Sequence, residues 1–345
     1  MDEVITVSGV IPASQLGPTL MHEHLLVDMR SASGEPMGLD DLETSIQELK
    51  VYERAGGAGL VDVSPPGLRL ETLPLKHPLA LRRIVEATGV QIVASTGYYL
   101  ESYYPEHLLT QSVDELAAGM VKDIMEGIEG TAIRAGIIGE IGTGDLFGRD
   151  FISPAEEKVL QASARAHLQT GVPITTHTFC GQLASEQLDL LEAEGVNLRR
   201  VVVGHLDWGR DIDLENCLAI AKRGAYVEFD LVGREGVYEY VAPPVRTKAG
   251  QLSDSPTSME GMRSEFPPDE RRVQAILAMS EAGFLQQILL SHDTFRKDQL
   301  HAYGGPGYDH LLSNFVPMLA AAGLSSQDIH ALLVENPRRV LTISR

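Results

Sequence analysis

Short apolar runs recur along the chain, and segments with apolar residues at helical spacing separate them. In one such segment, residues 154–169, Ser153 and Pro154 precede Glu156 and Glu157, which is the cap, proline and acidic first turn of a helix. The apolar runs themselves are nearly continuous, as in strands covered on both faces of a parallel sheet. Eight of these runs occupy residues 19–26, 60–63, 90–94, 135–140, 172–177, 201–205, 226–230 and 288–293.

Eight alternations of strand and helix predict an α/β fold, a (β/α)8 TIM barrel forming a single domain over residues 1–345. An open doubly wound sheet is the rival, but no glycine-rich phosphate loop follows the first strand. Long loops follow the seventh strand (231 to about 267) and the eighth strand (294 to about 308). Barrels carry their sites on this side, so we expect both loops to shape a substrate pocket. A disordered insertion is the alternative for the first loop.

Composition and charge narrow the class of protein. A hydrophobic content of 43% with 22% charged residues is globular, and no apolar run is long enough to span a membrane. The amino-terminal residues lack a secretion signal and two cysteines are too few for a disulfide framework, so we expect a cytoplasmic protein. The net charge of −20 disfavours nucleic acid and anionic membranes as partners, which leaves a small-molecule substrate.

Residues that commonly bind metals gather at the ends of the predicted strands. His22 and His24 lie one residue apart on the first strand, which places both imidazoles on one face. By itself this pair is weak evidence for a metal site, because two histidines buried in the core give the same pattern. Four later strands also end in such a residue, and strand ends converge on one rim of a barrel. The predicted metal ligands are therefore His22, His24, Glu140, His177, His205 and Asp293.

Six protein ligands exceed the four of one tetrahedral zinc ion, so we expect two divalent metal ions that share a bridging carboxylate and a bridging hydroxide. Zinc is the first choice, although manganese, cobalt and iron suit the same ligands. We expect His292 and Glu23 to face away from the metals, with Glu23 in a buried ion pair. The sequence does not decide whether His301 and His310, in or just beyond the loop after the eighth strand, belong to the site or to the surface. The other histidines are expected on the solvated surface: His77, His107, His167 and His330.

A series of motifs spans the chain: residues 19–24, 134–138, 170–178, Gly204-His205, residues 287–293 and Asn336-Pro337. Together they resemble the phosphotriesterase family of the amidohydrolase superfamily. The resemblance implies that His22, His24 and Asp293 bind the more buried metal. It assigns His177 and His205 to the more exposed metal and a bridging carboxylate to the fourth strand. Many relatives pair as homodimers, so we expect a homodimer.

The chain departs from the enzymes that give the family its name. Those enzymes use a carbamylated lysine as the bridge, but residues 138–143 contain no lysine. A glutamate bridge marks the phosphotriesterase-related branch, which the chain resembles more closely in this segment, in Gly97-Tyr98-Tyr99 and in the loop at 296–308. When the chain is aligned with those enzymes without a gap from Arg134, the position of their bridging lysine falls on Gly139. Glu140 then needs a bulge near Gly139 to face the metals.

A second departure concerns the proton relay of the organophosphate hydrolases. The two relay positions hold Leu231 and Trp208, so we expect the catalytic residue Asp293 to act alone as general base and then acid. We therefore place carbonyl substrates (a lactone, carboxylic ester or amide) ahead of organophosphates. The alternatives are a phosphotriesterase, a non-catalytic protein that binds metal, and a deaminase-type enzyme with one metal.

Several further residues are candidates for substrate binding. Three cations lie in the two long loops: Arg234, Arg296 and Lys297. They would hold an anionic group of the substrate, unless they are simply solvated. Tyr98, Tyr99 and Trp208 would line the pocket. Asp230 would support a ligand or contact the substrate, with capping of the strand end as the alternative. The predicted substrate-binding residues are Tyr98, Trp208, Asp230, Arg234, Arg296 and Lys297.

Overall fold

A parallel sheet of eight strands forms the centre of the computed structural model, which describes residues 2–30, 36–70, 72–144, 149–239 and 263–343. The strands neighbour one another in chain order, which matches a nearly closed barrel and not a doubly wound sheet. The eight predicted strands are confirmed. They are β3 (Thr19–Glu23), β6 (Gly59–Asp62), β7 (Gln91–Thr96), β8 (Ala135–Gly142), β9 (Ile174–His177), β10 (Val201–Val203), β11 (Tyr226–Phe229) and β14 (Ile288–Leu290).

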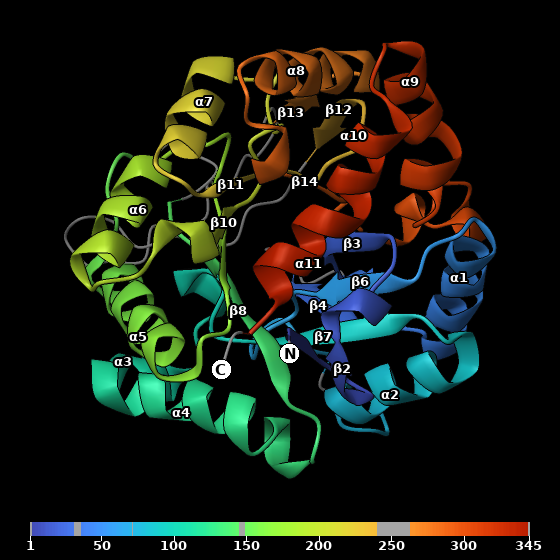
Figure 1. The fold of residues 1–345 in the computed structure, drawn as a ribbon. Helices are drawn as coiled ribbons and strands as arrows, with labels where there is room; N and C mark the ends of the chain where they lie inside the picture. Colours follow the sequence, from blue (N-terminus) through green and yellow to red (C-terminus); the bar gives the residue numbers. More distant parts are fainter. Residues whose placement is uncertain (1, 31–35, 71, 145–148, 240–262, 344–345) are drawn as a thin grey trace.

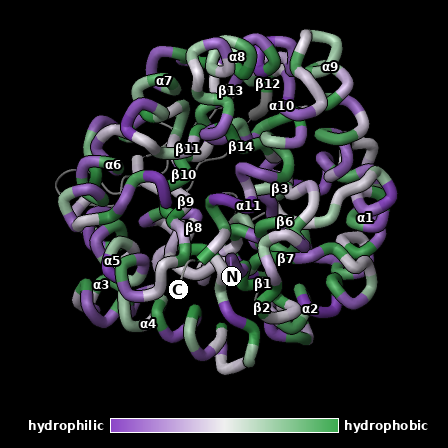
Figure 2. Tube along the Cα trace, viewed as in Figure 1, coloured by the Kyte–Doolittle hydropathy of each residue, from purple (hydrophilic) through white to green (hydrophobic). Residues whose placement is uncertain are grey.

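Helices form a ring around this barrel (Figure 1). The longest is α5 (Pro154–Thr170), which begins at Ser153 with a capping box to Glu156 and ends at Gly171 in the left-handed conformation, φ 77°. Along the outer helices, hydrophobic and hydrophilic stretches alternate in Figure 2, as expected for helices with one buried face. The others are α1 (Leu42–Arg54), α2 (His77–Thr88), α3 (Glu106–Thr110), α4 (Val113–Met125), α6 (Ala184–Ala193), α7 (Leu214–Lys222), α8 (Asp269–Glu281), α9 (Val316–Ala321), α10 (Ser326–His330) and α11 (Asn336–Leu341).

The amino end of the barrel is plugged by the two ends of the chain. The hairpin β1 (Glu3–Thr6) and β2 (Gly9–Pro12) lies beside the carboxyl-terminal residues, with the N–H of Ile343 donating to the carbonyl of Glu3 at 2.8 Å. The marks for both ends of the chain lie inside the ring of helices in Figure 1. A buried apolar cluster fills this end: Val4, Ala13, Leu16, Met21, Val61, Val63, Val93, Ile137, Val202, Tyr226, Leu289, Val340 and Leu341. A site at the opposite, carboxyl end therefore stands on a packed floor.

Two further hairpins belong to connections at the carboxyl ends of strands. β4 (Val27–Arg30) pairs with β5 (Pro36–Leu39) after β3, and β12 (Gly236–Glu239) pairs with β13 (Arg263–Phe266) after β11. The predicted loop after the seventh strand thus includes two short strands, and residues 240–262 between them lie outside the described residues. The loop after β14 contains two single turns, Lys297–Gln299 and His301–Tyr303.

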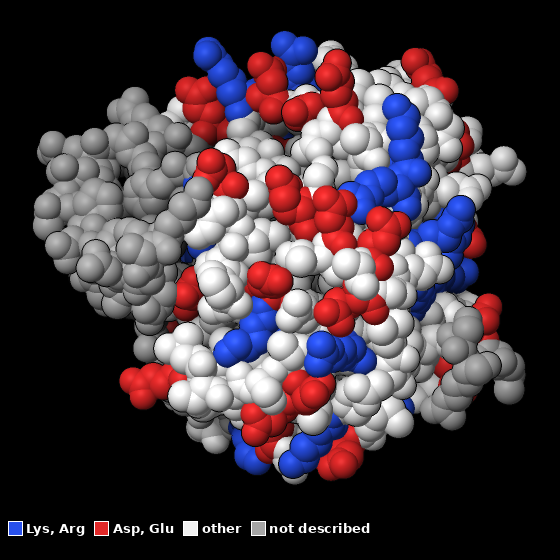
Figure 3. Space-filling model, turned by 90° about the vertical axis from the view of Figure 1, so that its left-hand side faces the viewer, with Lys and Arg blue, Asp and Glu red and all other residues white. Residues whose placement is uncertain are grey.

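The described part of the chain contains no helix able to span a bilayer. On the face drawn in Figure 3, basic side chains are interspersed among acidic ones. This face is therefore mixed in charge, although the whole chain carries a net charge of −20.

Candidate metal centre

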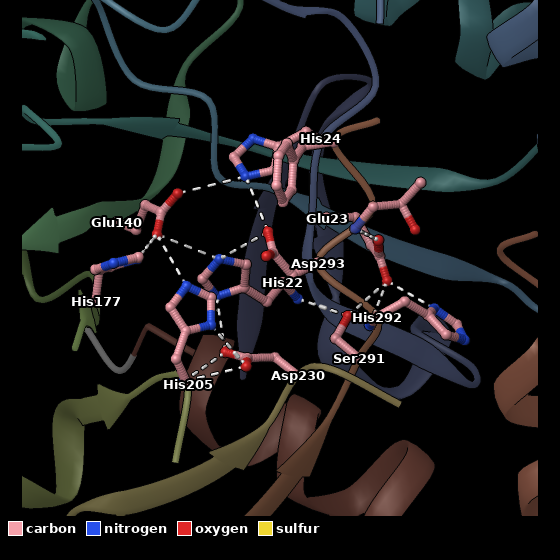
Figure 4. A network of polar contacts seen from close by, with 12 residues as sticks. His22, Glu23, His24, Glu140, His177, His205, Asp230, Ser291, His292 and Asp293 are labelled. Carbon is pink, nitrogen blue, oxygen red and sulfur yellow. Dashed lines mark hydrogen bonds and ion pairs between the residues drawn. The ribbon is translucent and has the colours of Figure 1, made fainter. Parts of the chain in front are cut away.

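The carboxylate of Glu140 lies among four histidines at the carboxyl end of the barrel (Figure 4). Its Oε2 atom is 2.9 Å from Nδ1 of His177, 3.4 Å from Nε2 of His22 and 3.6 Å from Nε2 of His205. Its Oε1 atom is 3.4 Å from Nε2 of His24. The two oxygens of one carboxylate therefore face different histidines, as a bridge between two ions requires.

Asp293 completes the group. Its Oδ1 atom is 3.4 Å from Nε2 of His24 and 3.9 Å from Nε2 of His22. All six side chains predicted as ligands come together at one rim, and none is more than 4% exposed. The structure thus assembles the cluster from β3 and the residue after it, from β8 and β9, and from the turns that follow β10 and β14.

Strand β8 is irregular where the sequence predicts a bulge. Its register with β9 shifts between Ile138 and Ile141. Gly139 has φ 125°, and a Cβ atom at this position would collide with the backbone carbonyl of Thr175. Only glycine fits there, and the shift lets the next residue, Glu140, point towards the histidines.

The other ring nitrogen of three histidines is bonded to a side chain behind it. Such a partner fixes the ring and leaves Nε2 directed at a metal. The pairs are His22 Nδ1 with Glu228 Oε2 at 3.2 Å, His24 Nδ1 with Ser64 Oγ at 2.9 Å, and His205 Nδ1 with Asp230 Oδ1 at 2.8 Å. His177 is reversed: its Nδ1 faces Glu140, and its Nε2 lies 3.5 Å from the hydroxyl of Tyr99.

The donor atoms fit divalent cations. Two ligands about 2.0–2.2 Å from a tetrahedral ion lie roughly 3.3–3.6 Å apart, close to most of the nitrogen–oxygen separations above. Nε2 of His22 is buried and makes no hydrogen bond to any described residue, so a cation would supply a missing partner. Three compact donor groups include His22: the first with His24 and Asp293, the second with Glu140 and His205, and the third with Glu228 and Asp230.

Both carboxyl groups are held in the ionised form that binds metals. Burial acts to raise the pKa of Glu140, but the neighbouring His22, His177 and His205 hold that pKa well below 4.5. Burial also acts to raise the pKa of Asp293, and the guanidinium of Arg234 together with His24 lowers it. Burial and the adjacent His205 lower the pKa of His177 to about 4, which keeps this imidazole neutral.

Two of the candidate ligands have strained backbone. His205 has φ 58° and Asp293 has φ 50°, in the left-handed region that residues other than glycine rarely adopt. Each lies just after the end of its strand, where the chain turns its side chain into the barrel mouth. Strain of this kind persists only where surrounding contacts impose it, and it is concentrated at functional sites.

Trp208 and Arg234, two predicted substrate-binding residues, lie beside the cluster. The Trp208 ring lies 5.7 Å from the ring of His205 and 5.6 Å from the ring of Phe266. The Arg234 guanidinium is 5.3 Å from the Phe266 ring and 5.0 Å from that of Phe295. Its Nη2 also lies 3.2 Å from Oδ2 of Asp293. An aromatic wall with one cation thus adjoins the candidate metals.

Asp230, a third predicted substrate-binding residue, is fully buried. Its Oδ1 and Oδ2 atoms accept the backbone N–H of His205 at 3.1 and 3.0 Å. Its Oδ2 also lies 3.3 Å from Nδ1 of His22. These contacts match the alternative in which Asp230 supports ligands from behind.

The remaining three predicted substrate-binding residues lie outside the cluster. Tyr98 packs its ring 6.2 Å from that of Tyr104, and it is the next residue, Tyr99, that reaches His177. Arg296 pairs with Asp298 at 2.8 Å. Lys297 pairs with Asp40, next to the start of α1, at 2.7 Å. The Lys297–Asp40 pair links the loop after β14 to the segment before α1, whereas the Arg296–Asp298 pair lies within that loop.

The prediction that His77 and His167 lie on the surface is wrong, because both are buried. His77 pairs with the buried Asp62 at 3.2 Å, and Nδ1 of His167 donates to the carbonyl of Val172 at 2.7 Å. His107 and His330 are exposed as predicted. The two histidines left unassigned by the sequence both contact a carboxylate: Nε2 of His301 lies 2.5 Å from Oδ1 of Asp309, and Nε2 of His310 lies 2.9 Å from Oδ2 of Asp269.

Sequence reasoning missed Ser64 and Glu228, which hold two of the candidate ligands. Glu228 precedes Asp230 by two residues, and strand alternation puts both on the face that points into the barrel. The two-residue spacing between Glu228 and Asp230 was the signal available in the sequence for Glu228. Ser64 likewise follows Asp62 by two residues at the end of β6. No spacing pattern links either residue to a particular histidine, because those contacts form between strands.

Comparison with known proteins identifies the family of the chain. The model of the phosphotriesterase family matches residues 2–341. The phosphotriesterase homology protein of Escherichia coli is 37% identical over 93% of this chain and 96% of its own. The human N-acetyltaurine hydrolase is 30% identical over 99% of this chain and 98% of its own.

A solved structure extends the comparison. The crystal structure of a lactonase from Listeria monocytogenes superposes with a TM-score of 0.81 at 27% identity, covering 99% of this chain and 100% of that one. The named activities among these relatives are hydrolytic, which supports a metal-dependent hydrolase. Because the family model covers nearly the whole sequence, the chain belongs to the phosphotriesterase family.

Proposed function

We propose that this protein is a binuclear metal-dependent hydrolase that cleaves a carbonyl substrate, namely a lactone, a carboxylic ester or an amide. The observation that carries the proposal is the position of Glu140, whose Oε1 atom faces His24 and whose Oε2 atom faces His22, His177 and His205. One carboxylate between two sets of histidines is an arrangement suited to two ions.

In this proposal His22, His24 and Asp293 hold one ion, His177 and His205 hold the other, and Glu140 bridges them. When bound, two divalent ions would polarise the scissile carbonyl and supply an activated water at neutral pH. Zinc is the proposed native metal, with manganese, cobalt and iron as alternatives. A homodimer and a cytoplasmic location remain part of the proposal.

Asp293 is the proposed catalytic residue. Its pKa is held low, so the carboxylate is ionised and ready to accept a proton from the attacking water. It then returns that proton to the leaving group. Nη2 of Arg234, 3.2 Å from Oδ2 of Asp293, fixes the orientation of the carboxylate during both transfers.

The substrate class is argued from what surrounds the metals. Trp208 and Leu231 occupy the relay positions of the organophosphate hydrolases, and neither side chain can carry a proton. An N-acetyltaurine hydrolase and a lactonase among the relatives favour amide or lactone bonds. Organophosphate hydrolysis is the second candidate, supported by the family match alone.

The proposed substrate contacts are those residues that lie beside the candidate metal ligands. Trp208 would pack against the apolar part of the substrate, and Arg234 would attract an anionic group. The contacts of Asp230 support a role in holding His205 instead. Substrate binding by Tyr98, Arg296 and Lys297 stays a prediction from the sequence.

Metal analysis combined with a substrate panel tests the proposal. The metal-free protein is reloaded with zinc, and kcat/KM is measured on lactones, N-acyl amino compounds and phosphotriesters. We expect two ions per chain and the highest kcat/KM on a carbonyl compound. A preference for phosphotriesters would favour the second candidate, whereas tightly held metal without turnover on the panel would favour a binding protein.

A further inference from the structure

Strands β3 and β14 meet at the seam of the barrel without a regular ladder. They are the two ends of the eight-strand order, and no ladder joins them in the residues described. At the candidate metal centre individual hydrogen bonds cross this seam instead, and three of them are made by His22 and His24. The N–H of Asp293 donates to the carbonyl of His22 at 3.1 Å, that of His24 to Thr294 at 3.2 Å, and that of His22 to Oγ of Ser291 at 2.9 Å.

The carboxylate of Glu23 occupies the centre of this seam (Figure 4). Its Oε1 atom accepts the hydroxyl of Ser291, the backbone N–H of His292 and the ring Nδ1–H of His292, each at 2.8 Å. Its Oε2 atom accepts the backbone N–H of Thr294 at 2.9 Å. Glu23 is fully buried, and these partners surround Asp293 on both sides along the chain.

The ring of His292 extends this network. Because its Nδ1 faces a carboxylate and its Nε2 accepts the backbone N–H of Leu311 at 2.9 Å, the hydrogen must be on Nδ1 of a neutral ring. Leu311 begins the helical turn that follows the loop after β14. One buried carboxylate thus connects β3, the end of β14 and the end of that loop.

We propose that Glu23 is a positioning residue that sets the turn at Asp293 and so aims its carboxylate at the metals. Asp293 has φ 50°, and such a conformation needs surrounding contacts to hold it. Glu23 provides them by binding the N–H groups immediately before and after Asp293. This inference rests on the proposed function, because it assumes that Asp293 binds a metal.

Glu23→Gln tests the inference against Glu48→Gln as a matched control. Glutamine keeps the shape but turns one acceptor oxygen into an NH2 donor facing other donors. Glu48 is also a buried glutamate that accepts two backbone N–H groups, those of His301 and Ala302 at 3.0 and 2.9 Å, and it contacts none of the candidate ligands. The variants are compared by thermal unfolding and by zinc competition with a chelator.

We expect Glu23→Gln to weaken binding of one of the two zinc ions by about 10–100-fold, and kcat to fall with little change in KM. Glu48→Gln should retain both zinc affinities. Hydrogen exchange on the metal-free protein gives a second measure, because the amides of His292 and Thr294 should lose protection in Glu23→Gln alone. Unchanged zinc affinities and unchanged protection in Glu23→Gln would overturn the inference.

A pair of variants at His292 decides the case if Glu23→Gln does not fold. His292→Asn can still donate to Glu23, whereas His292→Leu cannot. We expect the asparagine variant to retain more of the zinc affinity than the leucine variant, and equal losses would contradict the inference. If the wild-type protein binds no zinc, the proposed function fails, while the exchange experiment still reports whether Glu23 holds the turn.

Discussion

Oδ1 of Asp230 lies 2.8 Å from Nδ1 of His205, and the two oxygens of the same carboxylate accept the backbone N–H of His205. One side chain therefore holds both the ring and the left-handed backbone of a candidate ligand. Asp230 is held in turn, because its own N–H donates to Asp207 at 3.2 Å, and Nε of the fully buried Arg272 donates to Asp207 at 2.6 Å. His205 is thus supported by a chain of three buried side chains, Asp230, Asp207 and Arg272.

Asp230→Ala should weaken binding of the ion assigned to His177 and His205. Removing the carboxylate frees the His205 ring and its backbone turn, and the loss of such a supporting partner costs about 10–100-fold in metal affinity. Zinc titration against a chelator measures this change. Asp213→Ala serves as the control, because Asp213 caps α7 and lies in an exposed bond with Asn216. Equal zinc affinity in both variants would show that Asp230 does not support the site.

Arg234→Met should distinguish two roles of the guanidinium. If Arg234 attracts an anionic substrate, kcat/KM falls by roughly 10–100-fold on an N-acyl amino acid and much less on a neutral ester of the same acyl group. If it acts by orienting Asp293, both substrates lose kcat equally. Because the proposal gives Arg234 both roles, we expect kcat to fall on both substrates and kcat/KM to fall further on the N-acyl amino acid. Steady-state kinetics on the two matched substrates give the answer.

His167 should make the protein less stable in mild acid. Burial is the main cause that lowers its pKa from 6.5, and the Arg200 charge adds to the effect. As the pH falls below 6.5, the unfolded chain binds this proton before the folded protein does, so stability declines with decreasing pH. Urea unfolding of metal-free protein should show a smaller decline in His167→Gln than in the wild type. The exposed His107→Gln is the control, and an identical pH slope in the His167 variant would refute the prediction.

The barrel and the six candidate ligands were accessible from the sequence because each depends on local pattern. Nearly continuous apolar runs are typical of barrel strands, and a ligand at the end of a strand must face the common rim. The bulge at Gly139 also followed from a local mismatch, since Glu140 fell one residue away from the bridge position. These inferences needed no knowledge of which strands touch.

Contacts between distant segments were not accessible in this way. Lys297 pairs with Asp40, which is far away in the sequence, and no local pattern indicated this contact. Whether Tyr98 or Tyr99 reaches His177 depends on one turn after β7 that no periodicity determines. His167 looked like a surface residue because a helical position alone does not show what covers it.

Removal of metal should lower both activity and stability. An ion that binds only the folded state contributes about 2.7 kcal/mol when present at a hundred times its dissociation constant. Chelation should therefore abolish hydrolysis and lower Tm, and zinc, manganese or cobalt should restore activity without added bicarbonate, because residues 138–143 contain no lysine to carbamylate. A requirement for bicarbonate would argue against a glutamate bridge.

The metal content of Glu140→Ala tests the central claim most directly. Glu140 contacts all four histidines, so its loss should leave each ion without the ligand they share. Elemental analysis after zinc loading and removal of free metal should give two ions per chain for the wild type and fewer for Glu140→Ala, with hydrolysis abolished. A Glu140→Ala protein that retains two ions and wild-type kcat would contradict the account.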